Sequence, residues 1–260
     1  MTIFSKDTIF VLLLGVFAGC TSSSDDPVTT KEVSPESERK TEVITLEELE
    51  VPESIQPDTL GIRLRSFGLT SVTEIDSTFF IDLKYASTDN FLGENIYGNL
   101  KEVFLQDTVA KMLSKAHAFL KEEHPDLRML IYDGVRPLWV QQKMWNLLDS
   151  IPVSERVKFV SNPANGSLHN FACAVDLTLC DKQGNPLDMG AGYDDMRKIA
   201  YPELESHFLE SGELSKEQYQ NRMILRKSMR KAGFSQLPTE WWHYNAMNRN
   251  TARGKFEIVP

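Results

Sequence analysis

The sequence contains few cysteines, and their spacing argues against a disulfide. Only Cys20, Cys173 and Cys180 occur among its 260 residues. Disulfides form in proteins that leave the reducing cytoplasm, so the two later cysteines must be considered as a possible pair. However, Cys173 and Cys180 belong to one β-rich segment, and the intervening strand would hold their sulfur atoms far beyond bridging distance. We therefore predict that these two side chains are small buried hydrophobes.

The chain also lacks clustered basic residues. It has 28 Lys and Arg against 37 Asp and Glu, a formal net charge of -9. Residues 20–60 hold eleven acidic and three basic side chains, or -8, which leaves about -1 for the rest of the chain. A nucleic-acid-binding surface needs clustered Lys and Arg. The sequence therefore predicts no nucleic-acid partner.

The apolar run near the start of the chain, Ile9–Phe17, is too short to span a bilayer. With Lys6 before it, it is typical of an export signal. It ends in FAGC, which resembles a bacterial lipobox, where the cysteine is acylated and becomes the mature N-terminus. We expect residues 1–20 to be a lipoprotein signal peptide, and the protein to be exported and lipid-anchored to the cell envelope through Cys20. The alternative is an ordinary secretory signal with a chance cysteine.

The stretch after Cys20 has almost no aromatic or large apolar residues and is rich in Ser, Thr, Glu and Pro. Such a segment cannot bury enough apolar surface to offset the entropy of the chain. We therefore predict an acidic, disordered tether over residues 21–56 and a globular domain over residues 57–260. A solvated spacer is favoured over a partner-binding tail.

Strand and helix patterns are interspersed in the globular part, and no internal repeat is visible. They do not follow a regular strand–helix–strand rhythm, which favours an α+β fold. We predict a single compact domain with a central, mostly antiparallel sheet flanked by helices. The predicted strands are 72–85, 128–133, 171–179 and one that includes 239–245, and the predicted helices are 107–124, one beginning at Pro137, and 215–233.

Two of the five histidines have acidic residues nearby in the sequence. His169 is followed by Asp176, and Glu240 precedes His243. Two imidazoles and one carboxylate are a common catalytic zinc set that leaves a fourth position for water. A second carboxylate can then take the proton of that water. These spacings are too common to establish a site by themselves. We expect the other three histidines to be structural or solvated: His117, His124 and His207.

A wider set of motifs is more specific. NPANGSLHNFACAVDLTL follows the pattern S-x-H-x-x-G-x-A-x-D in all but one position, and EWWHY and DGVRP accompany it. These motifs resemble those of the zinc D-alanyl-D-alanine dipeptidases, the family that includes the dipeptidase of vancomycin resistance. Three further blocks resemble the same family: DLKYASTDNFLG, DMGAGYD and QNRMILRKSMRKAGF. The six blocks occur in family order from about Phe80 to Tyr244, nearly the whole globular part.

The resemblance implies a metal centre and two catalytic residues. His169, Asp176 and His243 would be the ligands of one Zn²⁺ per chain, which requires the chain to turn at residues 170–172 so that His169 comes back beside Asp176. Glu240 would be the general base. Arg136 would stabilise the oxyanion, a task suited to a fixed guanidinium in a dry site.

The resemblance also implies substrate contacts and an activity. Tyr85 and Asp194 would lie near the free amino end of the substrate, and Ser167 near its C-terminal carboxylate. The implied activity is zinc-dependent hydrolysis of D-Ala-D-Ala or a related cell-wall peptide. The alternatives are a D,D-carboxypeptidase that acts on peptidoglycan stem peptides, and a weakly active zinc module that binds cell-wall peptide.

Two positions depart from the family pattern. Ala172 replaces a glycine in the turn before Asp176, where glycine would tolerate positive φ. Val135 stands where the family usually has an aromatic residue before the arginine. The first departure raises a question about the geometry of the turn on which the metal centre depends.

Overall fold

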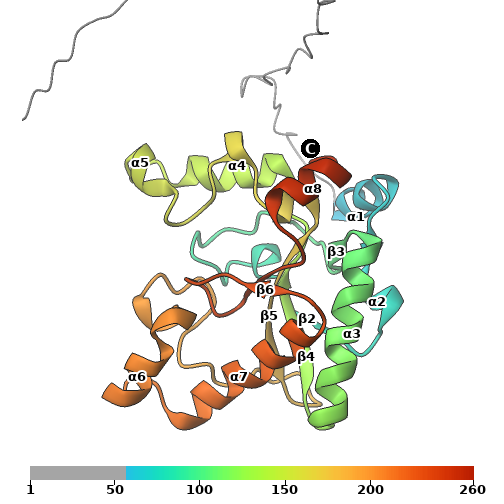
Figure 1. Cartoon of the computed structure of the whole chain (residues 1–260). Coiled ribbons are helices and arrows are strands. Elements are labelled where there is room, and N and C mark those ends of the chain that lie inside the picture. The colour runs from blue at the N-terminus through green and yellow to red at the C-terminus, as the bar shows by residue number, and fades with distance from the viewer. Residues whose placement is uncertain (1–56) are drawn as a thin grey trace, which may run out of the picture. The chain divides into compact units, whose positions relative to one another are not determined.

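The computed structural model describes residues 57–260, which are coloured in Figure 1. The predicted signal peptide, Cys20 and the predicted tether lie outside the described residues. None of the helices in residues 57–260 is long and apolar enough to cross a membrane.

A five-stranded sheet forms the centre of the domain. Its order is β2-β4-β5-β7-β6; β2 pairs with β4 in parallel, and the other three pairings are antiparallel. A smaller antiparallel sheet joins β1 to β3. The strands are β1 (Thr70–Ser71), β2 (Phe80–Ile81), β3 (Phe104–Leu105), β4 (Arg128–Asp133), β5 (Ala174–Cys180), β6 (Ser235–Gln236) and β7 (His243–Asn245). The predicted α+β domain with a mostly antiparallel sheet is confirmed.

Helices surround this sheet. The two longest, α3 and α7, pack against each other, and they contact β4 and β5 respectively. Figure 1 shows α4 and α5 toward one end of the long strands and α6 and α7 toward the other. The α-helices are α1 (Pro57–Ser66), α2 (Val72–Ile75), α3 (Asp107–Glu123), α4 (Leu138–Leu147), α5 (Val153–Arg156), α6 (Glu205–Ser211), α7 (Lys216–Lys231) and α8 (Arg249–Lys255).

Local sequence signals explain where the long helices begin and end. Ser215 and Gln218 form a reciprocal capping box at the start of α7. Gly233, with φ of 100°, follows its last turn, in a conformation that glycine adopts at little cost. In α3, buried side chains recur on one face, as its sequence predicts.

The predicted strand over residues 72–85 is wrong. Residues 72–75 form α2, and only Phe80 and Ile81 are strand. The reason is a local turn at Asp76, whose Oδ1 accepts a hydrogen bond from the Thr78 amide at 3.0 Å. Aspartate in this role favours a turn over a continuous strand. The strand predicted to include residues 239–245 is likewise shorter, and begins at His243.

The strand β5 is buried at all seven positions. Cys180 lies at its end and Cys173 immediately before it, and both are buried and free. The prediction that they act as small core residues is therefore confirmed. Burial raises the pKa of each thiol to about 12, so neither is a reactive thiolate at neutral pH.

His117 is a core residue, as predicted for a structural histidine. Its Nδ1 lies 3.1 Å from an Asp76 oxygen, its Nε2 accepts from the Met129 amide at 3.4 Å, and its ring stacks on Phe79. Burial, together with Lys121, lowers the pKa of His117 to about 4. The imidazole is therefore neutral near pH 7, with one nitrogen donating and the other accepting.

This neutral histidine predicts a pH dependence of stability. A histidine whose pKa is lower when folded stabilises the fold above its unfolded value of about 6.5, and the contribution is lost as pH falls toward the folded value. Relative to His117→Gln, the wild-type free energy of unfolding should decrease between pH 6.5 and 4, by at most about 3 kcal/mol. Urea denaturation of metal-free protein measures it. His207→Gln, on the exposed side of α6, is the control and should leave the slope unchanged.

Candidate active site

Three adjacent segments bring the candidate metal ligands together. Asp176 on β5 is the direct antiparallel partner of His243 on β7. His169 lies in a single 3-10 turn, His169–Phe171, that ends just before β5. The backbone amide of Cys173 donates to the Leu168 carbonyl at 2.9 Å, which closes this turn. The chain therefore folds back between His169 and Asp176, where the resemblance required a turn.

The turn depends on Ala172. Its φ of 54° and ψ of 36° lie in the left-handed region, and its side chain is fully buried. An L-residue in this conformation costs about 1 kcal/mol or more relative to glycine. Alanine, the smallest residue with a Cβ, therefore preserves the turn at a modest cost in stability. The second departure, Val135, is a buried core residue.

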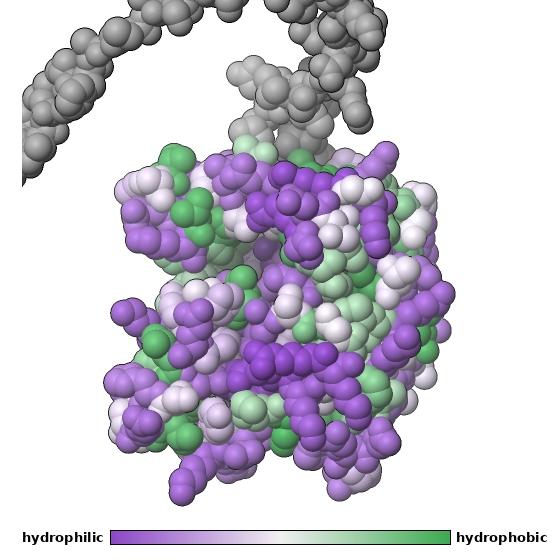
Figure 2. Space-filling view, in the orientation of Figure 1, coloured by the Kyte–Doolittle hydropathy of each residue, from purple (hydrophilic) through white to green (hydrophobic). Residues whose placement is uncertain are grey.

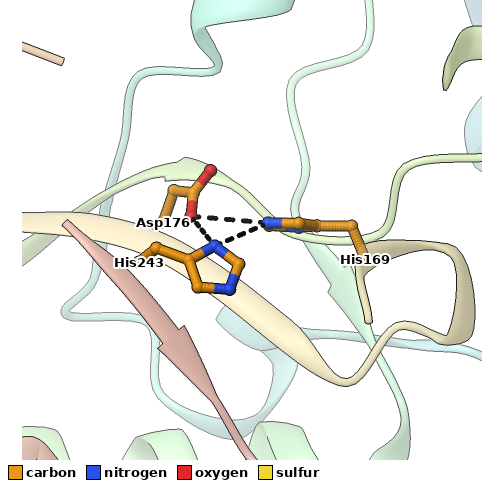
Figure 3. Close-up of side chains that lie close together, drawn as sticks. All are labelled: His169, Asp176 and His243. Atoms are coloured by element: carbon orange, nitrogen blue, oxygen red, sulfur yellow. Dashed lines mark hydrogen bonds and ion pairs between the residues drawn. The ribbon is translucent and has the colours of Figure 1, made fainter. Parts of the chain in front are cut away.

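The three side chains point their ligand atoms at one another (Figure 3). His169 Nε2 lies 3.2 Å from His243 Nδ1 and 3.4 Å from Asp176 Oδ1, and the last two atoms are 2.9 Å apart. Tetrahedral ligands of zinc, at about 2.0–2.1 Å from the ion, lie roughly 3.3 Å from each other. The spacing of these three atoms therefore fits a zinc ion.

Outer hydrogen bonds fix the tautomers of both histidines. His169 Nδ1 donates to the Gly134 carbonyl at 2.6 Å, and His243 Nε2 donates to Asn245 Oδ1 at 2.9 Å. Each bond leaves the other ring nitrogen with a lone pair directed at the centre of the triad, as metal-binding histidines require. Tyr193 donates to the second oxygen of Asp176 at 3.0 Å.

The charges of the triad favour a cation. Burial alone would raise the pKa of Asp176, but the two histidines outweigh it and hold that pKa well below its usual range. Burial would lower the pKa of His243, yet the Asp176 carboxylate raises it to about 9. The site therefore attracts positive charge, which a divalent metal ion supplies more strongly than a proton.

Arg136 is held rigidly beside the triad. Its Nε and Nη2 donate to Asp133 Oδ2 at 3.1 and 2.6 Å, and Tyr97 donates to the other Asp133 oxygen at 2.8 Å. Its guanidinium also stands 5.1 Å over the Tyr85 ring. Arg136 Nη1 has no partner among residues 57–260, so it remains available to a ligand oxygen.

Glu240 faces the triad without being one of its ligands. Its Oε2 lies 3.9 Å from His243 Nδ1, and its side chain is 32% exposed. Burial, reinforced by the negative charge of Asp176, raises the pKa of Glu240 against the opposing effect of His243. A carboxylate with a raised pKa, next to the position of a metal-bound ligand, is suited to proton transfer.

Tyr85 and Asp194 form a separate acidic pair. Tyr85 donates to the Asp194 carboxylate at 3.1 Å. Burial, followed by the charge of Asp176, raises the pKa of Asp194 to about 8. The structure thus brings these two predicted substrate-binding residues together, although they are distant in sequence.

Ser167 is nearly buried, and other groups engage its hydroxyl. Its Oγ donates to Gln141 Oε1 at 2.8 Å and lies 3.1 Å from Asn170 Oδ1. A substrate carboxylate would have to compete with these oxygens for the single hydroxyl hydrogen. The contact between Ser167 and the C-terminal carboxylate of a substrate stays a prediction.

One cavity of about 600 Å³ joins these groups. Its wall includes the triad, Arg136, Glu240, Tyr85, Asp194 and Ser167. It is also lined by residues 157–161, after α5, and by Met196 and Tyr201, before α6. Figure 2 shows the surface hollowed between these two regions. All the predicted site residues within residues 57–260 therefore line a single cavity.

Comparison with known proteins agrees with this geometry. The family described as D-Ala-D-Ala dipeptidase matches residues 65–259. The chain belongs to the D-Ala-D-Ala dipeptidase family. It is 32% identical to the D-alanyl-D-alanine dipeptidase of Escherichia coli over 63% of this chain and 77% of that one. It is 31% identical to the Enterococcus faecium D-alanyl-D-alanine dipeptidase over 68% of this chain and 90% of that one. The family is one of zinc peptidases.

Several residues that orient the candidate ligands and Arg136 of this dipeptidase-family chain were not predicted from the sequence. Asp133 lies in the quoted motif DGVRP, three residues before Arg136, and Tyr193 lies in DMGAGYD. Asn245 is two residues after His243, which on a strand places both side chains on one face. The sequence spacing could therefore have indicated the role of Asn245. No sequence spacing could have indicated the contact between Tyr193 and Asp176, because the fold alone brings these two residues together.

Arg222 on α7 supports the segment that carries Tyr193 and Asp194. It is buried, and it donates to the carbonyls of Met189 and Ile199 at 2.7 and 2.9 Å. These contacts hold both ends of the segment. The guanidinium also stands 5.9 Å over the Trp241 ring, next to Glu240. One buried cation thus contacts both the segment that carries Asp194 and the residue next to Glu240.

Metal analysis tests the proposed ligands. His169→Ala or His243→Ala should reduce bound zinc from about one per chain to near zero after dialysis, because each removes one of three protein ligands. The matched control is His207→Ala, which replaces an exposed histidine on α6 and should retain the metal. Full zinc occupancy in both ligand variants would show that the ion binds elsewhere.

Proposed function

We propose that this chain is a zinc-dependent dipeptidase that hydrolyses D-Ala-D-Ala, with one Zn²⁺ held by His169, Asp176 and His243. One observation carries the proposal. In a member of this family, the metal-ligand triad, Glu240 and Arg136 line a single cavity. The names of the curated relatives support the same substrate.

The chemistry that a bound zinc ion supplies is acidification of a water molecule and polarisation of the scissile carbonyl. Glu240 takes the proton of the attacking water and later passes it to the leaving amine. The position of its carboxylate, 3.9 Å from a ligand nitrogen, and its raised pKa suit both transfers. No other carboxylate on the cavity wall lies as close to His243 without also being a ligand.

Arg136 stabilises the negative oxygen that develops on the substrate. Asp133 fixes its Nε and Nη2, so the guanidinium needs little reorganisation when charge develops near Nη1. Preorganised donors of this kind typically contribute a few kcal/mol to catalysis. Asp133 is therefore a positioning residue that acts through Arg136.

Asp194 and Tyr85 bind the free ammonium group of the substrate. Burial and the charge of Asp176 make the Asp194 carboxylate unfavourable by itself, and an ammonium group beside it would relieve that cost. An acid that requires a cation favours a dipeptide, whose amino end is charged, over an acylated peptide, whose amino end is not.

The alternative, a D,D-carboxypeptidase, also has an observation in its favour. Asp194 lines a second, open hollow of about 500 Å³ with Lys84, Tyr132 and Tyr193. A longer peptide could continue into this hollow beyond Asp194. A catalytically weak zinc module is the least supported alternative, because both Glu240 and Arg136 are present in the site.

The protein is exported and lipid-anchored to the cell envelope in this proposal, where it takes part in turnover of cell-wall peptide. The motif FAGC at Cys20 supports the anchor. Cys20→Ser should remove the acylated residue and shift the protein from the membrane fraction. Unchanged partitioning of that variant would favour an ordinary signal or another anchor.

Replacing Glu240 separates catalysis from metal binding. Glu240→Gln preserves the size of the side chain and removes its basicity, so zinc content should stay near wild type. The kcat for D-Ala-D-Ala should fall by at least ~100-fold, the lower range for loss of general acid–base assistance. Release of free D-alanine and metal analysis on the same sample measure both quantities. Full activity in this variant would show that another group moves the proton.

Replacing Asp194 distinguishes the dipeptidase from the carboxypeptidase. Asp194→Ala should raise KM for D-Ala-D-Ala by ~10-fold or more, because the ammonium loses its charged partner. An N-acylated substrate ending in D-Ala-D-Ala lacks that ammonium and should be far less affected. Comparable damage to both substrates would remove the main support for the dipeptidase. Wild-type enzyme that prefers the acylated peptide would favour the carboxypeptidase.

A further inference from the structure

A dipeptide carries a charge at each end, and the site residues described above provide a charged partner for only one of these two charges. Asp194 and Tyr85 suit the ammonium. Ser167, which the resemblance places near the carboxylate, is neutral, and its hydroxyl hydrogen is directed to Gln141 and Asn170. A free carboxylate in a partly enclosed cavity requires a stronger donor.

The cavity wall contains three cationic side chains, and two of them have acidic partners. Arg136 is bound to Asp133 at 2.6 Å, and Lys158 forms an ion pair with Glu155 on the surface. The third is Arg249, the first residue of α8. Within residues 57–260, the Arg249 guanidinium has neither an acidic partner within 4 Å nor a hydrogen bond.

Arg249 belongs to the segment that follows the candidate ligand His243, four residues after the end of β7. It lines the cavity together with Ser161, Ser167 and Asn245. One turn further along α8, Arg253 donates to the Asn165 carbonyl at 2.8 Å, so this helix lies against the segment that leads into Ser167.

The acidic pair reaches the cavity from other segments of the chain. Tyr193, next to Asp194 in the chain, binds the outer oxygen of Asp176, and Tyr85 lies beneath the Arg136 guanidinium. Asn245, by contrast, binds the outer nitrogen of His243. The acidic pair and Arg249 therefore reach the same cavity from different segments of the chain, which gives a zwitterion a partner for each of its charges.

We propose that Arg249 binds the C-terminal carboxylate of the substrate and so determines specificity for a free carboxyl end. A guanidinium can donate two parallel hydrogen bonds to a carboxylate, which orients the residue that leaves as well as attracting it. The inference rests on the proposed peptidase function, and it holds for a dipeptide and for a longer peptide with a free D-Ala end.

The test compares two substrates in two variants of the full chain. In Arg249→Gln, KM for D-Ala-D-Ala should rise by ~10-fold, typical of a lost hydrogen bond to a charged group. The KM of D-Ala-D-Ala amide, which has no carboxylate, should change less than twofold. If the amide is cleaved too slowly, its inhibition constant against the dipeptide gives the same comparison. Arg249→Lys should recover part of the loss, because it restores the charge without the paired donors.

Lys255→Gln is the matched control, because it removes a positive charge from the exposed last residue of the same helix, and the Lys255 side chain has no ion pair or hydrogen bond within residues 57–260. It should leave both KM values unchanged, and zinc content should be unchanged in all three variants. An equal effect of Arg249→Gln on dipeptide and amide, or no effect on either, would overturn the inference while leaving the peptidase function intact. Wild-type protein inactive on every peptide ending in D-Ala-D-Ala would instead refute the proposed function.

Discussion

Negative charge in and beside one cavity is the constraint that the active site must satisfy. Four carboxyl groups, those of Asp133, Asp176, Asp194 and Glu240, lie close together, and Arg136 is paired with the first of them. Buried charge must be compensated. The pKa of Asp194, raised to about 8, is one consequence. A zinc ion beside Asp176 and a substrate ammonium beside Asp194 would each add positive charge next to these carboxyl groups, so metal binding and dipeptide binding relieve the same crowding of negative charge.

The sheet determines where these charges stand. Asp133, Asp176 and His243 occupy facing positions on β4, β5 and β7, so three neighbouring strands present them along one line. Gly134, immediately after β4, is needed there because a Cβ would lie 2.5 Å from a Val103 methyl group. Its carbonyl then accepts from His169. A steric requirement in the core therefore also fixes the orientation of a candidate zinc ligand.

The sequence predicted the long helices, the buried strands β4 and β5 and the turn before Asp176, because periodicity, capping residues and motifs are local signals. It did not predict that Asp76 interrupts the segment 72–85. The alternating β-forming residues of that segment favour a strand, and one turn-forming residue is a weaker signal. The motifs identified the candidate site residues, but they did not identify the residues that orient those side chains. Tyr193 and Arg222 reach the site only through tertiary packing, which no spacing in the sequence encodes.

Arg222 also links the segment that carries Asp194 to the residue next to Glu240. It is fully buried, its Nε and Nη1 bind backbone carbonyls on both sides of Asp194, and Glu205 lies 3.4 Å from Nη1. Its Nη2 has no hydrogen-bond partner within residues 57–260, and the guanidinium stands over Trp241, the neighbour of Glu240. The residue that would bind the ammonium and the residue that would move the proton thus share one support. A displacement of Arg222 would therefore disturb substrate binding and proton transfer together.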